Sequence, residues 1–290
     1  MIPQNVRTAV VAALGQPIRA VRAAGGGDIN RAARVVTDGG TFFLKYHPRP
    51  PAGFFGAEAA GLRLLERAGG PRVPVPVAWD DQDRPAWLLL TWLEQGRSRE
   101  AAAARLGEGL AQVHRSLEPR GRFGLDQDNF CGLTPQPNGW STDWITFFQE
   151  RRLGHQMTLA AERDRLPTPR RQRLERLLAR LGEWLPVRPP ASLLHGDLWG
   201  GNWLPLADES AAVIDPAVSY GHREADLAFT ELFGGFPPSF RTAYEAAWPL
   251  DSDYPVRRDL YNLYHLLNHL NLFGEAYGAS VDRVLARYVS

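Results

Sequence analysis

The sequence predicts an α+β fold of two lobes, a small N-terminal lobe built on an antiparallel sheet and a larger, mainly helical C-terminal lobe. Short strand-like apolar runs separated by Gly, Asp and Asn turns are concentrated before residue 92. Beyond Glu94 the apolar residues recur at helical spacing instead. At 290 residues the chain exceeds one typical core, which favours two lobes with a cleft between them. We place the lobes at residues 1–92 and 93–290, with a hinge at about residues 90–94.

The N-terminal lobe is expected to contain two helices and five strands. Phe55, Ala59, Leu62 and Leu65 repeat at helical spacing, and Glu58 lies beside this stripe. The expected elements, in order, are a helix at about Pro3–Leu14, strands near 18–24, 29–37 and 41–46, the helix that carries Glu58, and strands near 75–79 and 86–91.

The C-terminal lobe is expected to be helical except around two central strands. Three helices are marked by Leu106, Leu110, Val113 and Leu117, by the run from Trp144 to Leu153, and by Leu174, Leu177, Leu178 and Leu181. Further helices are expected near residues 222–233, 237–247, 256–277 and 280–288. A group of arginines that includes Arg165 and Arg170 lies opposite the leucines of the third helix, and we expect a solvated face there.

The strongest functional signal is the run His195–Asn202 followed by Val213–Pro216. An Asp, an Asn five residues later and a second Asp after the next apolar strand reproduce the spacing of a kinase catalytic loop. Asp197 is the expected base for a substrate hydroxyl, while Asn202 and Asp215 offer the hard oxygen ligands that Mg²⁺ prefers. The alternative is a Gly- and Asp-rich turn that merely joins two strands, but the register of all three residues favours a phosphotransferase.

Two segments are candidates for binding the nucleotide. Gly25, Gly26 and Gly27 lie between strand-like runs, where glycines let backbone N–H groups approach phosphates, although a Gly-rich hairpin turn would look similar. The run of Leu90, Thr91, Trp92 and Leu93 ends an apolar strand and suits a hinge whose backbone pairs with adenine. Any buried strand could have this pattern, so the hinge depends on the other motifs.

Lys45 is the only lysine in a chain with 33 Lys and Arg residues, and it lies on a predicted strand. A compact ammonium can reach the α- and β-phosphates in a way that the planar guanidinium of Arg cannot. Glu58, on the following helix, is the expected partner of Lys45. The alternative is that a single lysine remains in the sequence by chance.

Several motifs together resemble the fructosamine kinase (ketosamine kinase) family, in the aminoglycoside-phosphotransferase-like branch of the protein-kinase fold. They are LLHGDLWGGNW at 193–203, DPAVSYGHREADLAF at 215–229, FGLDQDNFCGLTPQPNGW at 123–140 and NLYHLLNHLNLFGEAY at 262–277. The resemblance implies ATP- and Mg²⁺-dependent phosphorylation of the 3-hydroxyl of ketosamines, the Amadori-type adducts of amines. Their 3-phosphates are unstable, so the amine is regenerated. The resemblance leaves open fructosyl or ribulosyl adducts, and free or protein-bound substrates.

Two rival functions remain at this stage. A kinase for another small hydroxyl compound, such as an aminoglycoside, choline or a thiosugar, would share every residue on the ATP side. A pseudokinase that binds nucleotide as a regulatory module is the second, and the intact Lys45, Asp197, Asn202 and Asp215 argue against it.

Three further residues bear on the substrate side. Trp199, two residues after the expected base, could cover a sugar face or pack between lobes. His265 and His269 are four apart on a predicted helix; zinc binding lacks a visible third ligand, so we expect core packing, with His269 as a candidate substrate-facing group. Asp226 is expected to brace the loop at Asp197 by accepting backbone hydrogen bonds.

The bulk properties suggest a cytoplasmic enzyme. A net charge of +1 argues against nucleic acid as the main partner. The single cysteine, Cys131, permits no internal disulfide and is expected to be free and packed. No apolar run approaches the ~20 residues of a membrane span. The sequence does not indicate an oligomeric state.

Overall fold

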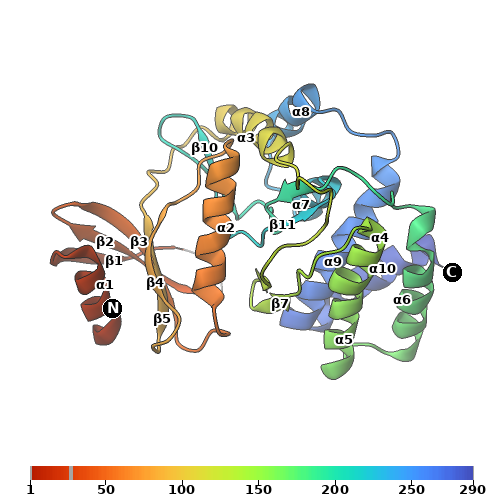
Figure 1. Ribbon diagram of the computed structural model, residues 1–290, viewed down its shortest axis with the longest axis horizontal. Helices are drawn as coiled ribbons and strands as arrows, with labels where there is room; N and C mark the ends of the chain where they lie inside the picture. The colour runs from red at the N-terminus through yellow and green to blue at the C-terminus, as the bar shows by residue number, and fades with distance from the viewer. Residues whose placement is uncertain (1, 26–28, 290) are drawn as a thin grey trace.

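The N-terminal part of the chain forms a five-stranded antiparallel sheet with one helix on each face (Figure 1). The computed structural model describes residues 2–25 and 29–289. The strands lie in the order β1-β2-β3-β5-β4. The elements are α1 (Gln4–Leu14), β1 (Ile18–Ala23), β2 (Arg31–Thr37), β3 (Gly40–His47), α2 (Phe54–Ala68), β4 (Pro76–Asp80) and β5 (Ala86–Thr91). These positions confirm the elements predicted for this part of the chain.

Alternation along β3 and β5 assigns side chains to the two faces of the sheet. Leu44 on β3 and Leu89 on β5 pack with α1, whereas Phe43 and Leu88 pack with the apolar stripe of α2. Lys45 pairs with Leu88 across the ladder and so lies on the α2 side. The alternation of side chains along β3 therefore places Lys45 on the face of the sheet that is covered by the helix with Glu58.

Helix α2 is fixed at its N-terminus by a residue distant in sequence. The carboxylate of Asp81, in the turn between β4 and β5, accepts hydrogen bonds from the backbone N–H groups of Phe55 at 3.0 Å and Gly56 at 2.7 Å. These N–H groups have no partner within the helix, and an anion is favoured at this end of the helix dipole. Asp81 thus orients α2 against the sheet.

The remainder of the chain is mainly helical (Figure 1). Its helices are α3 (Arg99–His114), α4 (Trp144–Phe147), a π-helix (Phe148–Gly154), α5 (His155–Glu162), α6 (Thr168–Arg180), α7 (Glu224–Leu232), α8 (Pro238–Ala247), α9 (Tyr254–Phe273) and α10 (Gly278–Tyr288), with 3-10 turns at Leu181–Glu183 and Glu275–Tyr277. Its short strands are β6 (Asn129–Cys131), β7 (Thr134–Gln136), β8 (Ser192–Leu194), β9 (Trp203–Pro205), β10 (Ala211–Val213) and β11 (Ser219–Gly221).

Two sequence predictions for this part were wrong in detail. Leu117 lies outside α3, which ends at His114, because the chain leaves the helix there and Leu117 forms a β-bridge with Ser192 of β8. Arg170 is not on a solvated face: it is buried and forms ion pairs with Glu275 and Asp282. Its partners follow it by 105 and 112 residues, so local periodicity could not reveal them.

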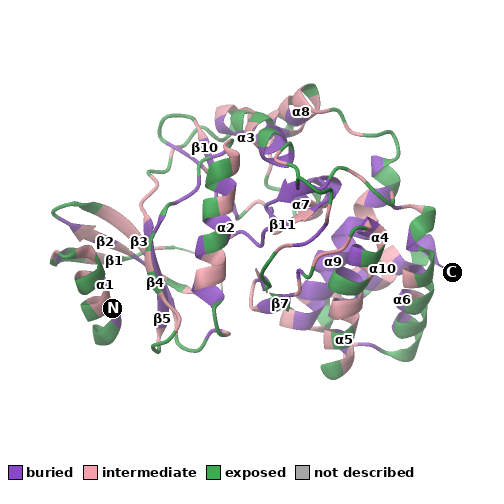
Figure 2. Cartoon of the chain, viewed as in Figure 1, coloured by how far each residue is buried: buried purple, intermediate pink, exposed green. Residues whose placement is uncertain are grey.

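Helix α9 is the centre of the C-terminal core. Figure 2 shows it buried along most of its length, behind the more exposed α5. A second core joins α2 and β5 to α3, α8 and the β9–β10 hairpin, so buried apolar packing continues from the N-terminal sheet into the helical part. Among the described helices, none has the length and apolarity needed to cross a membrane.

Candidate active site

Lys45 joins two carboxylates from different parts of the chain. Its Nζ lies 2.7 Å from Glu58 Oε1 on α2 and also forms an ion pair with Asp215 Oδ1, just after β10. Burial on its own lowers the pKa of Lys45, but the attraction of Asp215 and Glu58 outweighs burial and raises that pKa above its ordinary value. Lys45 therefore carries a fixed positive charge, and the predicted contact with Glu58 is present.

The backbone at Asp215 is held in an unusual conformation. Asp215 has a φ of 57°, in the left-handed region that few residues other than Gly adopt. Pro216 follows it, and a Cβ built on Gly61 of α2 would lie 3.2 Å from a methyl carbon of Val218. A glycine inside a helix costs about 0.5–1 kcal/mol relative to Ala. This glycine lets α2 approach the segment that aims Asp215 at Lys45.

Asn202 is hydrogen-bonded to the expected base. Its Nδ2 donates to the backbone oxygen of Asp197 at 2.8 Å and to Asp197 Oδ2 at 3.1 Å. The N–H of Ile214 donates to the backbone oxygen of Asn202 at 3.0 Å, which places Asn202 beside the segment that carries Asp215. Because the amide nitrogen faces Asp197, Oδ1 of Asn202 remains available to a cation.

Asp226 braces the loop that precedes Asp197, as predicted. It accepts hydrogen bonds from the backbone N–H groups of His195 at 2.7 Å and Gly196 at 2.9 Å, and its Oδ2 lies 3.1 Å from His114 Nε2. Burial opposes ionisation of Asp226, but hydrogen bonds from His114 and from the backbone of Gly196 keep its pKa below the ordinary value. Gly196 has a φ of 81°, and a Cβ there would lie 2.0 Å from the carbonyl oxygen of Ala217, so glycine is required.

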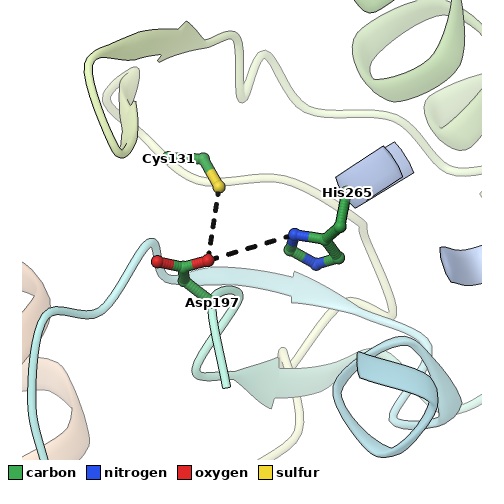
Figure 3. A group of neighbouring side chains, drawn as sticks. All are labelled: Cys131, Asp197 and His265. Atoms are coloured by element: carbon green, nitrogen blue, oxygen red, sulfur yellow. Dashed lines mark hydrogen bonds and ion pairs between the residues drawn. The ribbon is translucent and has the colours of Figure 1, made fainter. Parts of the chain in front are cut away.

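Asp197 itself lies beside side chains from two other segments, Cys131 and His265 (Figure 3). Its side chain is 18% exposed, Cys131 Sγ donates to Oδ1 at 3.6 Å, and His265 Nδ1 lies 4.0 Å from the same oxygen. Burial raises the pKa of Asp197 to about 7; the charge of Asp215 adds to this shift, and hydrogen bonds from Cys131 and Asn202 oppose it. A carboxylate with this pKa can accept a proton near neutral pH.

The predicted hinge has one free backbone donor. The N–H of Thr91 donates to Val75 at 3.0 Å and that of Trp92 to Thr41 at 3.3 Å, both within the N-terminal sheet region. Within the described residues, the N–H of Leu93 has no such acceptor, so it is the amide best placed to meet an adenine nitrogen. Leu90, the first residue of the predicted hinge, lies on β5 and is buried in the core. The role of this segment in nucleotide binding stays a prediction.

The Gly-rich turn is only partly described. Gly25 follows β1, and a Cβ built there would meet no atom within 4 Å. Gly26 and Gly27 lie outside the described residues. Phosphate binding by this turn stays a prediction.

The two predicted substrate residues differ in their surroundings. Trp199 is 40% exposed, and its ring covers Gly201, where a Cβ would lie 2.4 Å from the indole. His269 is half-buried among aromatic side chains and its Nδ1 lies 2.8 Å from the backbone oxygen of His265. The histidine that lies next to Asp197 is His265, one helical turn earlier.

Sequence reasoning missed Cys131 and His265 as neighbours of Asp197. Cys131 ends β6, whose hairpin with β7 is held by Asn129 and Gln136: Gln136 Nε2 donates to Asn129 Oδ1 at 2.8 Å and to the backbone oxygen of Ala217 at 3.0 Å. These contacts dock the hairpin on the segment between Asp215 and β11. The cluster of polar residues at 127–138 was the available signal, but it did not indicate the direction of docking.

The fold and the site define the chain as a protein-kinase-like phosphotransferase, with a sheet-bound lysine, a helix glutamate, and two aspartates and an asparagine from the helical part of the chain. A family model for fructosamine kinase matches residues 2–290. The chain belongs to the fructosamine kinase family.

Relatives extend over nearly the whole chain. A "probable ketoamine kinase" of Lactiplantibacillus plantarum is 42% identical and covers 93% of this chain and 95% of its own length. The "protein-ribulosamine 3-kinase, chloroplastic" of Arabidopsis thaliana is 38% identical, over 94% of this chain and 83% of its own. The crystal structure of a "putative fructosamine-3-kinase" from Thermobifida fusca has a TM-score of 0.88 at 34% identity, covering 99% of this chain and all of that one. Choline kinase LicA from Streptococcus pneumoniae, at 15% identity and a TM-score of 0.65 over 98% of this chain and 99% of its own, shares the fold.

Proposed function

We propose that this protein transfers the terminal phosphoryl group of ATP to the 3-hydroxyl of a ketosamine, a fructosyl or ribulosyl adduct of an amine. The observation that carries the proposal is the contact of Asp197 with Asn202 next to the ion pair of Asp215 with Lys45, which puts a base, an amide ligand and a phosphate-binding cation in one connected set. Membership of the fructosamine kinase family supports the substrate class. Its product, a ketosamine 3-phosphate, is unstable and releases the amine.

Asp197 is proposed to accept the proton of the attacking hydroxyl. Its Oδ2 is engaged by Asn202 at 3.1 Å, which leaves Oδ1 as the oxygen that faces Cys131 and His265. A substrate hydroxyl that approaches Oδ1 would replace the weak thiol contact with a stronger O–H···O hydrogen bond. The buried position of Asp197 keeps the carboxylate basic enough to take that proton near neutral pH.

Lys45 is proposed to bind the α- and β-phosphates of the nucleotide. Glu58 holds its ammonium on the α2 side of the sheet, at 2.7 Å, so Lys45 needs little further ordering when the nucleotide arrives. The free N–H of Leu93 is proposed to bind the adenine. Alignment and charge neutralisation of this kind supply most of the catalysis in phosphoryl transfer.

Asp215 and Asn202 fit a magnesium ion by the chemistry of their donor atoms. One supplies an anionic carboxylate and the other a neutral amide oxygen that has no role in holding Asp197. When bound, magnesium would neutralise charge on the phosphate oxygens. The protein's part is to hold Asn202 beside the segment that carries Asp215, through the backbone hydrogen bond from Ile214 to Asn202.

A kinase for a different hydroxyl compound is the remaining alternative, and α9 offers no buried carboxylate, among the described residues, that would suit a substrate with several ammonium groups. Its buried polar residues include Asn262, His265, Asn268 and Asn271, and no Asp or Glu is among the buried residues of this helix in the described chain. Aminoglycosides carry several ammonium groups and favour anionic surroundings. Neutral amides and imidazoles suit the hydroxyls of a sugar.

The test is a substrate panel with purified protein and labelled ATP. We expect phosphorylation of a fructosyl amine or a ribulosyl amine, loss of the labelled phosphate from the product on standing, and recovery of the free amine. Aminoglycosides and choline should remain unlabelled. Robust labelling of either one, with none of any ketosamine, would overturn the proposed substrate class.

A further inference from the structure

Two chemically different ligand groups, a thiol and an imidazole, converge on one oxygen of Asp197. Cys131 Sγ comes from β6, His265 Nδ1 from α9, and Asp197 Oδ1 from the loop after β8; these atoms all lie within 4.8 Å of one another (Figure 3). Thiolate, imidazole and carboxylate are the three ligand types that zinc takes from proteins.

The imidazole of His265 is buried, fixed and without a partner. Its Nδ1 makes no hydrogen bond within the described residues although the residue is only 5% exposed. The ring is stacked on Phe229, which prevents it from turning away. Burial holds the pKa of His265 well below its ordinary value, so the ring is neutral and offers a lone pair. A buried nitrogen that faces Asp197 and makes no hydrogen bond indicates that a bound ligand satisfies it.

The thiol of Cys131 is held in place in a similar way. It is the only cysteine of the chain, it is buried, and it accepts a hydrogen bond from Asn268 Nδ2 at 3.3 Å while it donates to Asp197. Burial raises the pKa of this thiol, so a metal would bind with release of one proton to solvent.

We propose that Cys131, Asp197 and His265 form a binding site for a zinc ion, with a fourth position open to water. Zinc bond lengths of about 2.0–2.3 Å in a tetrahedral site imply ligand atoms about 3.3–3.7 Å apart. The distance from Sγ to Oδ1 is already 3.6 Å, and that from Nδ1 to Oδ1, at 4.0 Å, requires a shift of a few tenths of an ångström.

The site would distinguish zinc from magnesium by ligand type. Asp215 and Asn202 present only oxygens, which magnesium prefers, whereas sulfur and nitrogen ligands favour zinc and other softer metals. Zinc in this site would occupy the lone pair of Asp197 Oδ1. The zinc ion would then block the proposed base and inhibit phosphorylation even when magnesium is saturating. This consequence rests on the proposed function.

Cobalt(II) gives a direct test of the ligand set, because a thiolate bound to cobalt absorbs in the near ultraviolet. One equivalent of Co²⁺ is added to the unmodified, nucleotide-free protein in excess Mg²⁺. We expect one thiolate-to-cobalt band per chain, which one equivalent of Zn²⁺ abolishes. Since Cys131 is the only thiol, no other residue can produce this band. Its absence from the folded, unmodified protein would overturn the site.

Variants then assign the ligands. Cys131→Ser and His265→Ala should each weaken Zn²⁺ binding, measured against a coloured chelator, by more than about 100-fold, since partners outside the ligand shell already contribute about 10–100-fold. His47→Gln, on β3, is the matched control and should bind Zn²⁺ as the unmodified protein does. Equal affinity in all three variants would overturn the proposal, even if cobalt binds elsewhere.

The metal site and the proposed function can fail separately. Zn²⁺ should inhibit ketosamine phosphorylation with the midpoint found in the chelator assay, and added Mg²⁺ should not relieve the inhibition. If the protein shows the cobalt band but phosphorylates no ketosamine, the metal site is supported and the proposed function is refuted. If the protein phosphorylates ketosamines but shows no cobalt band, only the metal site is refuted.

Discussion

Asn202 Nδ2 donates hydrogen bonds to both the backbone oxygen and the carboxylate of Asp197, at 2.8 and 3.1 Å. One amide thus orients the proposed base with its nitrogen and presents its oxygen to the proposed metal position. The two proposed roles, proton acceptance and metal binding, are coupled through a single side chain. Substitutions at Asn202 and at Asp215 should consequently have different effects.

Asp215→Ala should weaken magnesium-dependent nucleotide binding more than Asn202→Ala, by at least about tenfold, or about 1.4 kcal/mol. The former removes an anionic ligand and leaves Lys45 with Glu58 alone, while the latter removes a neutral oxygen. Fluorescent nucleotide titration with and without Mg²⁺ measures both. Equal nucleotide affinity with and without Mg²⁺ in the unmodified protein would refute the metal assignment.

Asp197→Asn should lower turnover by roughly 10²–10⁴-fold, the range expected for a positioned general base. The amide keeps the size of the carboxylate but cannot accept the proton. Nucleotide affinity should be largely retained, because Lys45 and Asp215 are unchanged. Steady-state turnover and nucleotide titration are measured on the same preparation. Near-normal turnover would show that Asp197 is not the general base.

The ketosamine kcat/KM should fall as the pH drops through about 7, because burial raises the pKa of Asp197 to about 7 and only its deprotonated form can act as a base. Cys131→Ala should move this acidic limb to higher pH, since the thiol's hydrogen bond favours the carboxylate. The pH profile of the unmodified protein is the reference. A profile without an acidic limb between about pH 5 and 8 would contradict the assignment.

Lys45→Arg should lower kcat/KM for ATP by about 10–100-fold, as expected when a charged hydrogen bond worth about 1.5–3 kcal/mol is lost. The planar guanidinium does not reproduce the compact ammonium that contacts Glu58 and Asp215. Glu58→Gln, which keeps the lysine but weakens its anchor, should have a smaller effect of the same sign. Unchanged ATP kinetics in Lys45→Arg would show that the single lysine has no role in phosphate binding.

The N-terminal part of the fold could be predicted because its signals are local. The period-two runs of β3 and β5 and the apolar stripe of α2 are complete within a few residues, and they also imply that Lys45 faces Glu58. Leu117 continued a helical spacing, yet pairing with β8 ends the helix before it. Tertiary pairing overrode local periodicity there.

The neighbours of Asp197 could not be predicted because two distant segments supply them. Cys131 precedes Asp197 by 66 residues, and His265 follows it on α9. From the sequence, His269 is the substrate-facing candidate of the two histidines on α9, and only the packing on Phe229 shows that His265 is the one next to Asp197. Contacts of this kind depend on how the helices dock.

Trp199→Ala should raise the KM for a fructosyl or ribulosyl amine while leaving the KM for ATP nearly unchanged. The indole is 40% exposed and lies over Gly201, in the same loop as Asp197, so it can cover a sugar face. A stacking surface contributes to substrate binding and not to phosphate alignment, so kcat should change less than KM.

The matched control is Trp79→Ala on β4, a tryptophan of similar exposure at 38% that stacks with Arg63. It should leave both KM values unchanged, because it lies on the sheet lobe and not in the loop of Asp197. Initial rates over a matrix of ketosamine and ATP concentrations separate the two KM values for each variant. If Trp199→Ala instead raised the KM for ATP, the side chain would belong to the nucleotide site, and recognition of the sugar would have to come from α9.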